Sequence, residues 1–382
     1  MNNWKKHIPF YVLELLVLLV VIYGSVWVFR ATRVEKVNLN ASNIDVNDEI
    51  KKEAQIAKGE IDTPTKSDTS SSDNEAEASD DIDKEKISKE LYDKYNGKFN
   101  IAFFGVDSRE GQLGKGTRTD SLMVCSINME THEVRLVSVY RDTYLNVGKD
   151  SYNKCNAAYA IGGPERAISM LNTNMDLYVT DYVTVGFEGL IDAIDALDGV
   201  VIDVTEEEIF HLNNYQKSMA DTLGVEYTPV VYAGPQMLNG LQATAYCRIR
   251  YTNGSDFKRA ERQRDVITAM LERTKVASVS KLTDAVIAIF PNISTSLNLG
   301  DIIDMMSIAS DYKVTVSTGF PFDGHLNGAN MSCGLSVIPT DLTKNVVKLH
   351  KVLYDEEDYK PSDTVKKYSQ KIKSMTNGKL LY

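Results

Sequence analysis

Apolar residues gather in short runs along the middle of the chain, and polar or glycine-rich stretches separate those runs. FNIAFFGVD from Phe99, DSLMVCSI from Asp120 and VRLVSVYRD over residues 134–142 are apolar and bounded by turn residues. This pattern is typical of strands. DYVTVGF over residues 181–187 and VVIDV after Gly199 have the same character. We therefore predict five strands in this part of the chain.

Stretches with helical spacing of apolar residues alternate with these strands. The predicted helices cover residues 164–175, 190–199, 238–246, 257–275, 282–290, 302–310 and 342–354. Alternating strands and helices favour an α/β fold. We expect a mixed α-β-α sandwich, in which helices cover both faces of a central, mostly mixed β-sheet. The lysine-rich residues 356–382 are expected to form a loose, polar C-terminal tail.

One apolar run near the N-terminus is much longer than the others. Residues 8–29 contain a single charged side chain, Glu14, and their number matches one bilayer crossing. The run exceeds a signal-peptide core, and no clear small-x-small cleavage site follows it. We therefore predict an uncleaved transmembrane anchor, with a cleaved signal as the alternative, preceded by a short head of residues 1–7.

The segment between this run and the first predicted strand is polar. Its centre, SDTSSSDNEAEASDD over residues 67–81, has no aromatic and no large aliphatic side chain. Such a segment cannot bury enough apolar surface to offset the entropy of ordering. Residues 30–96 are therefore predicted to be an acidic, largely disordered spacer, which holds the globular residues 97–355 away from the membrane.

Composition excludes some classes of function. The 382 residues carry a formal net charge of −11, and 43% of them are hydrophobic. This indicates a globular protein and argues against nucleic-acid binding, which needs a basic face. The four cysteines are widely spaced with no CxxC, so a zinc site is improbable. Buried thiols and disulfides both remain open for Cys125, Cys155, Cys247 and Cys333.

Arginines are concentrated in one stretch, YCRIRYTNGSDFKRAERQR over residues 246–264. A guanidinium group binds paired oxygens, so such a cluster indicates a phosphate or carboxylate ligand. A charged helix face with i,i+4 pairs is the alternative. Arg248 and Arg250 would share one face of an extended segment. Arg264 is expected to be a surface charge.

The helix that follows carries further polar candidates. Arg259 and Gln263 are four residues apart, and Arg262 lies nearby on the same side. Asp256 precedes the predicted helix, where it would be an N-cap or a catalytic carboxylate. Together these side chains would present several donors to one polyanion.

The stretch GVDSREGQLGKGTRTDS, residues 105–121, carries two carboxylates. One strand ends at Asp107 and Asp120 opens the next, so both would lie at neighbouring strand ends. With Arg109 and Arg118 beside them, they suit a magnesium ion and an anionic oxygen ligand. A hairpin loop with surface charges is the alternative interpretation.

A third candidate is the end of the strand VRLVSVYRD, where Arg141 and Asp142 follow an apolar run. Charged residues at the carboxyl end of a strand in an α/β sheet lie where ligands bind. A salt bridge at the strand end is the alternative.

Seven pieces of the chain, in this order, resemble the LytR-CpsA-Psr (LCP) family. They are IAFFGVDSR, TRTDSLMVCSIN, LVSVYRDTYLNV, KCNAAYAIGG, ALDGVVIDV, LNGLQATAYCRIR and GSDFKRAERQRDVI, and they span residues 99–275. The chain departs from the family pattern at two positions. Tyr140 stands where the family usually has proline, and Cys247 stands where it usually has alanine.

The resemblance implies a membrane-anchored phosphotransferase at the outer face of a Gram-positive-type cell membrane. Such an enzyme moves a glycopolymer from a polyprenyl pyrophosphate carrier to peptidoglycan and forms a phosphodiester link. Its partners would be the lipid-linked glycopolymer, peptidoglycan and the bilayer, with the N-terminus cytoplasmic and residues 97–355 extracellular. The polymer, whether teichoic acid, capsule or another wall polysaccharide, stays open. A polyprenyl pyrophosphate hydrolase and a non-catalytic lipid- or polymer-binding regulator are the alternatives.

The resemblance also implies roles for individual residues. Asp107 and Asp120 would bind magnesium, or manganese in its place. The residues that would hold the pyrophosphate are Arg118, Arg141, Arg248, Arg250, Arg259 and Gln263. Those that would complete the site are Arg109, Arg262, Asp142 and Asp256. Asp142 or Asp256 would take the proton of the acceptor hydroxyl, and the apolar strands with the helix at residues 190–197 would line a tunnel for the lipid tail.

Overall fold

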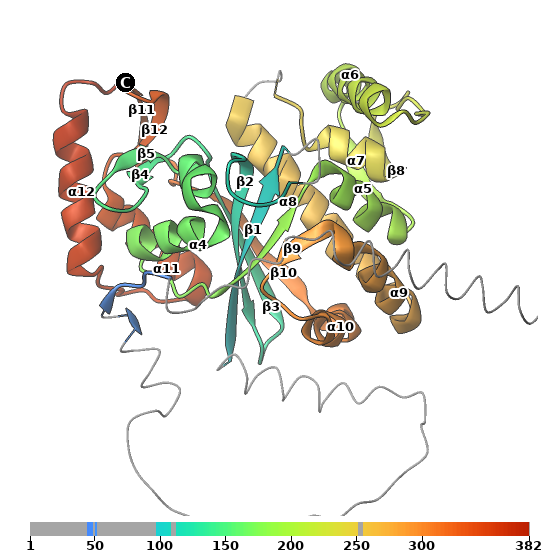
Figure 1. Ribbon diagram of the computed structural model, residues 1–382, viewed down its shortest axis with the longest axis horizontal. Coiled ribbons are helices and arrows are strands. Elements are labelled where there is room, and N and C mark those ends of the chain that lie inside the picture. Colours follow the sequence, from blue (N-terminus) through green and yellow to red (C-terminus); the bar gives the residue numbers. More distant parts are fainter. Residues whose placement is uncertain (1–43, 49, 52–96, 108–111, 251–254, 382) are drawn as a thin grey trace, which may run out of the picture.

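The computed structural model describes residues 44–48, 50–51, 97–107, 112–250 and 255–381. Six strands form a central sheet in the order β10-β3-β2-β1-β6-β9 (Figure 1). These strands are β1 (Lys98–Val106), β2 (Thr119–Asn128), β3 (Glu133–Val139), β6 (Asp181–Val185), β9 (Ile293–Thr295) and β10 (Lys313–Phe320). β1 runs parallel to β6 and β10 runs parallel to β3, whereas the other neighbours are antiparallel. The sheet is therefore mixed, as predicted.

Helices cover both faces of this sheet (Figure 1). The helices of one side are α4 (Asn156–Met175), α11 (Leu342–Tyr354) and α12 (Asp363–Thr376). Those of the other side include α8 (Ser255–Thr274), α9 (Val279–Ile289) and α10 (Leu299–Ser307). Successive strand residues point to opposite faces, so Phe104 joins the core under α4, whereas Phe99 joins the core under α8 and α10. The predicted α-β-α sandwich is confirmed.

A second apolar unit adjoins the carboxyl end of β6. Its elements are α5 (Phe187–Ala196), β7 (Val200–Val204), α6 (Glu206–Leu223), β8 (Gly234–Leu238) and α7 (Gly240–Tyr246). β7 and β8 pair in an antiparallel two-stranded sheet. The sequence patterns had indicated α5, β7 and α7 but neither α6 nor β8.

The helix α4 begins earlier than its predicted start at Pro164. Gly162 and Gly163 have non-helical backbone angles, and Gly163 has a φ of 67°. The Gly-Gly-Pro sequence is therefore a kink within the helix, where only glycine adopts the positive φ at little cost. The turn before the kink holds the β1–β2 loop, because the Gly116 amide donates to the Ala160 carbonyl oxygen at 3.0 Å.

The prediction of a loose tail over residues 356–382 is wrong. The helix α12 lies in this region, and its Val365 and Ile372 are fully buried in the core that covers one sheet face. Ser362 caps the helix by accepting from the Val365 amide at 3.2 Å. The apolar residues of this lysine-rich segment recur at helical spacing, which is why they bury one face while the lysines stay in solvent.

The remaining C-terminal elements complete one end of the molecule. A hairpin of β11 (Leu326–Met331) and β12 (Gly334–Pro339) lies near the two-stranded sheet of β4 (Tyr144–Asn146) and β5 (Tyr152–Lys154) (Figure 1). Short 3-10 helices occupy Phe290–Asn292 and Ala309–Asp311. All four cysteines are free, and three of them are buried.

Part of the expected spacer packs on the folded domain. Asn47 is buried, and its amide donates to the Thr173 carbonyl oxygen at 3.2 Å, to the Ser362 hydroxyl at 3.3 Å and to the Asp176 carboxylate. These contacts correct the prediction of disorder for the described residues between 44 and 51. The predicted anchor at residues 8–29 lies outside the described residues. Among the residues that are described, no helix has the length and apolar character to cross a membrane.

Candidate functional site

A β-bulge sets the position of Asp120. In the pairing of β1 with β2, Gly105 lies opposite Ser121 and Val106 lies opposite Thr119. Asp120 is therefore the extra residue of β2. A bulge of this kind redirects a side chain away from the regular ladder. Asp120 consequently points towards the carboxyl end of β3 and the first turn of α8.

Three guanidinium groups converge on Asp120 from three separate segments. Arg141, just after β3, places Nη1 2.5 Å from Oδ1 of Asp120. Arg250, after α7, places Nη2 3.0 Å from Oδ2. Arg259, on α8, is buried and lies 4.0 Å from Oδ2 through Nη1. The structure therefore brings these four predicted site residues together.

Asp256 joins the same cluster. Its carboxylate lies 3.2 Å from Nη2 of Arg259, 3.5 Å from Nη2 of Arg141 and 3.9 Å from Nε of Arg250. The prediction that Asp256 is an N-cap is wrong, because α8 begins at Ser255 and Asp256 lies in its first turn. A carboxylate there also interacts favourably with the positive end of the helix dipole.

The guanidinium groups retain donors that these carboxylates do not use. Nε of Arg141 and both Nε and Nη1 of Arg259 are buried and have no hydrogen-bond partner among the described residues. A buried donor left without an acceptor costs about 1–3 kcal/mol. The cluster therefore suits an additional anion whose oxygens accept from these donors.

Burial and the neighbouring charges shift two pKa values in the cluster. Burial lowers the pKa of Arg259 to about 10, and although Asp256 opposes this shift, Arg141 adds to it. Burial alone would raise the pKa of Asp120, but Arg259, Arg141 and Arg250 outweigh burial and hold it below its usual value. Asp120 is therefore ionised at neutral pH, and desolvation makes the charged form of Arg259 less stable than it is in water.

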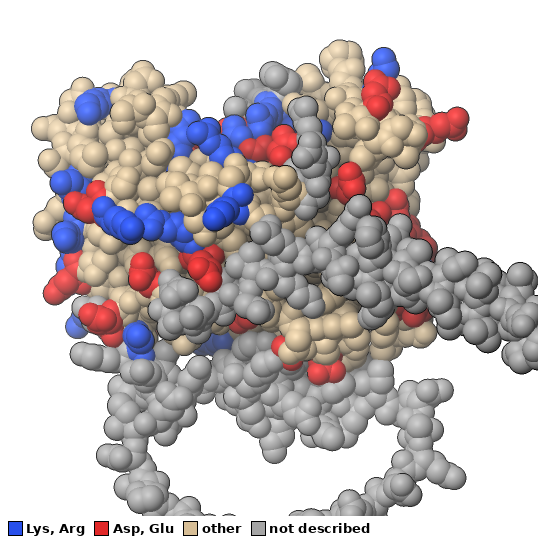
Figure 2. All heavy atoms as spheres, viewed as in Figure 1, with Lys and Arg blue, Asp and Glu red and all other residues tan. Residues whose placement is uncertain are grey.

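All of these side chains except Arg250 line a pocket of about 280 Å³. The charged part of its wall consists of Asp120, Arg141, Asp142, Lys154, Asp256 and Arg259. Gln263, predicted to lie one helical turn beyond Arg259, also lines it. Basic and acidic side chains gather at the upper edge of the molecule, over the region that holds β2 and α8 (Figure 2). None of residues 190–197, expected to line a lipid tunnel, is among the residues of this pocket. They lie in α5 and at its end, where Ile194 is fully buried in the second apolar unit.

Asp142 has a different partner from Asp256. Its Oδ1 lies 3.2 Å from Nζ of Lys154, at the end of β5, and its Oδ2 lies 4.0 Å from Nε of Arg141. Lys154 was not predicted as a site residue. It belongs to the piece KCNAAYAIGG, which carried the family resemblance, but a single lysine before a cysteine gives no chemical signal by itself.

Two of the predicted arginines have contacts away from Asp120. The guanidinium of Arg248 lies over the rings of Phe187 and Tyr215, at 4.4 and 5.4 Å from their centroids. Arg262 is buried and donates from Nε to Glu208 at 2.7 Å, and from Nη1 to the Ile249 carbonyl oxygen at 3.1 Å. In this structure, Arg262 therefore ties α8 to α6 and to the segment that carries Arg248 and Arg250.

The prediction that Arg264 is a surface charge is wrong. Its exposed fraction is 6%, and Nε donates to the Ser317 hydroxyl of β10 at 3.1 Å. Arg118 and Asp107, by contrast, are exposed at the two ends of the β1–β2 loop. Arg109 lies outside the described residues.

The predicted metal ligands, Asp107 and Asp120, come from neighbouring strands. Asp107 directly follows β1 and Asp120 lies at the bulge of β2, so both carboxylates occupy adjacent strand ends. Magnesium binds through one or two carboxylates together with water and phosphate oxygens. This pair of carboxylates fits that preference, although within the described parts of the chain no group of three or more His, Cys, Asp or Glu residues could hold a metal by itself.

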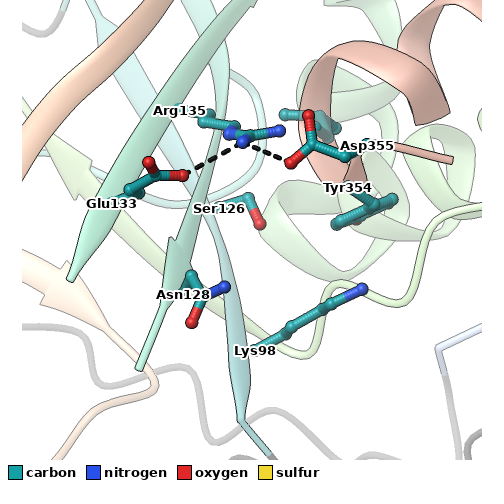
Figure 3. A pocket seen from close by; sticks show the side chains of 8 residues that line it. Lys98, Ser126, Asn128, Glu133, Arg135, Tyr354 and Asp355 are labelled. Atoms are coloured by element: carbon teal, nitrogen blue, oxygen red, sulfur yellow. Dashed lines mark hydrogen bonds and ion pairs between the residues drawn. The ribbon is translucent and has the colours of Figure 1, made fainter. Parts of the chain in front are cut away.

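A second, much smaller pocket lies at the opposite end of β1, β2 and β3 (Figure 3). Arg135 is held there by Glu133 at 3.0 Å and by Asp355 at 2.5 Å. The volume of about 30 Å³ admits roughly one water molecule. Because the guanidinium of Arg135 is already paired with Glu133 and Asp355, this pocket is not the candidate site.

Known proteins resemble this chain in sequence. The model of the LytR_cpsA_psr family matches residues 63–336. The polyisoprenyl-teichoic acid–peptidoglycan teichoic acid transferase TagU of Bacillus subtilis (strain 168) is 30% identical over 236 residues, which cover 61% of this chain and 70% of TagU. TagU of Bacillus cereus (strain AH820) is 33% identical over 232 residues, covering 59% of this chain and 70% of the relative.

Solved structures show the same fold. The crystal structure of B. subtilis TagV superimposes with a TM-score of 0.55 at 25% identity, covering 69% of this chain and 98% of TagV. A structure described as TagT bound to LIIa-WTA has a TM-score of 0.55 at 22% identity, covering 68% of this chain and 90% of TagT.

Proposed function

The chain belongs to the LytR_cpsA_psr family, and from this premise we propose that it is a phosphotransferase that moves a glycopolymer from a polyprenyl pyrophosphate carrier to peptidoglycan. One observation carries the proposal: three guanidinium groups converge on Asp120, and two of them, Arg141 and Arg259, keep buried donors open for a further anion. The names of the TagU relatives describe a transfer from a polyisoprenyl-linked teichoic acid to peptidoglycan.

The pyrophosphate of the donor binds at the arginine cluster. Nε of Arg141 and Nε and Nη1 of Arg259 donate to its non-bridging oxygens. Gln263 adds a neutral donor from the same helix. Phosphoryl transfer depends mainly on positioning and on neutralising charge on these oxygens. Groups fixed before the substrate arrives achieve this without reorganisation in the transition state.

A magnesium ion held by Asp107 and Asp120 would supply further charge neutralisation at the phosphate oxygens. The ionised state of Asp120, which its arginines maintain, suits this role. Manganese has the same ligand preference and would serve in its place.

Transfer joins the acceptor oxygen to the phosphorus that bears the glycopolymer. The bond from that phosphorus to the bridging oxygen breaks, and the lipid leaves as a monophosphate. The proton of the acceptor hydroxyl passes to a carboxylate. Asp142 suits this role better than Asp256, because Asp142 has two cations within 4.0 Å, whereas Asp256 has three. The product is a phosphodiester.

The proposal extends to the position of the protein in the cell. Residues 8–29 would anchor the chain in the membrane, with residues 1–7 in the cytoplasm and the domain outside. The apolar character of that run supports this arrangement. An extracellular domain would meet both the lipid-linked polymer and peptidoglycan.

A reconstitution assay tests the function. The purified full chain is supplied with a short-chain polyprenyl pyrophosphate-linked polymer and peptidoglycan, and the new phosphodiester is quantified by mass spectrometry. Asp120→Asn and Asp142→Asn should lower the yield at least roughly a hundredfold, and a chelator should do the same. Asp363→Asn, a change on the exposed face of α12, is the matched control.

The outcomes separate the alternatives. Equal release of free polymer phosphate with and without peptidoglycan would identify a hydrolase. No attachment by the unmodified chain would leave only a binding or regulatory role. Full attachment by both site variants would mean that transfer does not depend on Asp120 and Asp142, and the proposed site would then be wrong.

A further inference from the structure

The pocket at Asp120 has two unlike walls. One wall is charged and consists of the residues described above. The other has no charged side chain and is formed by Tyr140, Phe257 and the β11–β12 hairpin, of which Asn327, Leu335 and Ser336 face the pocket. A phosphate ligand accounts for the first wall only, because an uncharged wall contributes little to binding an anion.

Two aromatic rings define the corner between these walls. The rings of Tyr140 and Phe257 meet edge to face, with centroids 4.4 Å apart and an interplanar angle of 90°. Phe257 nevertheless stays 39% exposed. Leaving such a ring in solvent forgoes much of the stabilisation that full burial gives. An incompletely buried ring that lines a pocket suits a ligand that covers it.

Tyr140 reaches this position because β10 carries glycine beside it. A Cβ atom on Gly319 would lie 2.0 Å from the hydroxyl oxygen of Tyr140 and 2.3 Å from its ring. Any side chain at Gly319 would therefore displace the tyrosine. Tyr140 also stands where the family usually has proline, so the ring pair is a feature of this chain rather than of the shared motif.

The hairpin wall is linked to the proposed base. The Val337 amide donates to the main-chain oxygen of Asp142 at 2.9 Å, and Thr143 forms a β-bridge with Val337. At the hairpin turn, a Cβ atom on Gly334 would lie 3.9 Å from Nζ of Lys154, the lysine that holds Asp142. A molecule resting on the hairpin therefore lies next to the Asp142 carboxylate.

The chemistry of this wall indicates its ligand. A hexopyranose ring has apolar C–H groups on its faces and hydroxyl groups around its edge. Aromatic and aliphatic side chains such as Phe257, Tyr140 and Leu335 match these faces. We propose that Phe257, Tyr140 and the β11–β12 hairpin form the subsite for the acceptor sugar, and that this subsite presents a hydroxyl of that sugar to Asp142. The inference rests on the proposed transferase function and adds where its acceptor binds.

Steady-state kinetics test this subsite. A soluble peptidoglycan tetrasaccharide serves as acceptor, and KM is measured separately for it and for the lipid-linked donor. Phe257→Ala should raise the acceptor KM roughly tenfold, as expected for one aromatic contact, with a much smaller change in the donor KM. Phe257→Tyr keeps the ring and should restore the acceptor KM. Leu335→Ala, which shortens a hairpin side chain that is 58% exposed, should raise it as well.

Phe210→Ala is the matched control, since Phe210 is 68% exposed on α6, outside the pocket. An unchanged acceptor KM in Phe257→Ala would overturn the inference. If the donor KM rises as much as the acceptor KM, the ring binds the donor's sugar, and the inference is overturned too.

A direct binding measurement separates this inference from the proposed function. If the unmodified chain transfers no polymer, the transferase function fails. The subsite is then decided by calorimetric titration with the tetrasaccharide alone. The sugar site is supported if the tetrasaccharide binds to the unmodified chain and Phe257→Ala weakens that binding. It is refuted if the tetrasaccharide does not bind.

Discussion

Arg259 offers a test that separates a substrate-binding charge from a structural one. Its side chain is 3% exposed, and its Nε and Nη1 have no hydrogen-bond partner among the described residues. A structural arginine would stabilise the free protein, whereas an arginine held for a ligand would destabilise it. Arg259→Met keeps much of the length and the apolar contacts but removes the charge and the hydrogen-bond donors.

The magnitude follows from the pKa of Arg259. Burial, with the repulsion of Arg141, lowers it from 12.5 to about 10. One pKa unit corresponds to 1.36 kcal/mol, so the charged form is disfavoured by about 3 kcal/mol in the folded protein. Because the pKa of this base is lower when folded, the destabilisation is fully present below pH 10. It disappears as the pH rises from about 10 to 12.5.

The variant also loses favourable contacts. The hydrogen bond from Nη2 of Arg259 to the Asp120 main-chain oxygen, at 3.4 Å, is lost, which costs about 1–3 kcal/mol. The attraction to the Asp256 and Asp120 carboxylates is already part of the lowered pKa. Neither carboxylate becomes unpaired, however, since Asp120 and Asp256 keep Arg141 and Arg250 as neighbours. The two effects nearly cancel. We expect the free energy of unfolding of Arg259→Met to be unchanged or up to about 2 kcal/mol higher.

Two measurements on the purified chain give the answer. Urea unfolding reports stability, and calorimetric titration with a short-chain polyprenyl pyrophosphate reports binding. Loss of two charge-assisted hydrogen bonds should weaken binding at least roughly a hundredfold. Arg264→Met is the control, because Arg264 is buried on the same helix but donates to Ser317 outside the pocket. A variant at Arg259 that unfolds more easily yet binds pyrophosphate normally would refute the reasoning.

Three further predictions concern other parts of the molecule. The pKa of Asp120 lies below 3.8, so its ion pairs stabilise the fold above about pH 4 and are lost as the pH falls through the lowered pKa. Acid unfolding should therefore depend less on pH in Asp120→Asn than in the unmodified chain. Removal of residues 362–382 exposes the apolar partners of Val365 and Ile372 and should destabilise the domain by about 3–6 kcal/mol. The loss is measured as a lower Tm, and an unchanged Tm would mean that α12 does not stabilise the domain. Asn47→Ala removes buried hydrogen bonds to α4 and Ser362 and should cost about 1–3 kcal/mol, whereas Asn377→Ala, near the chain end, should cost little.

The sequence predicted the site best where chemistry and local pattern agree. Arg141 ends an apolar strand, and Arg250 and Arg259 flank a helix start, so their segments could be identified without tertiary information. The convergence of these arginines on Asp120 depends on the β-bulge opposite Gly105 and Val106. No local sequence pattern predicts that bulge. The charge type was therefore predictable from the sequence, whereas the geometry was not.

The contacts of Arg262 and Arg264 could not be predicted without tertiary information. Helical spacing places each on a face of α8 but does not say what covers that face. Glu208 lies 54 residues away from Arg262, and Ser317 lies 53 residues from Arg264. Partners so distant in sequence decide whether an arginine binds a ligand or holds two elements together. The same limit applies to the β11–β12 hairpin, whose place in the pocket depends on its contact with Asp142.

Asp120 explains how the three guanidinium groups are held together before a substrate arrives. Arg141 and Arg250 both repel Arg259, and low solvent exposure strengthens that repulsion. The carboxylate of Asp120, together with that of Asp256, offsets part of it and fixes their directions. The donors that have no hydrogen-bond partner among the described residues, Nε of Arg141 and Nε and Nη1 of Arg259, are the ones left for phosphate oxygens. Folding, rather than substrate binding, therefore supplies the free energy that brings like charges together, and a phosphate that enters the pocket meets a site already in place.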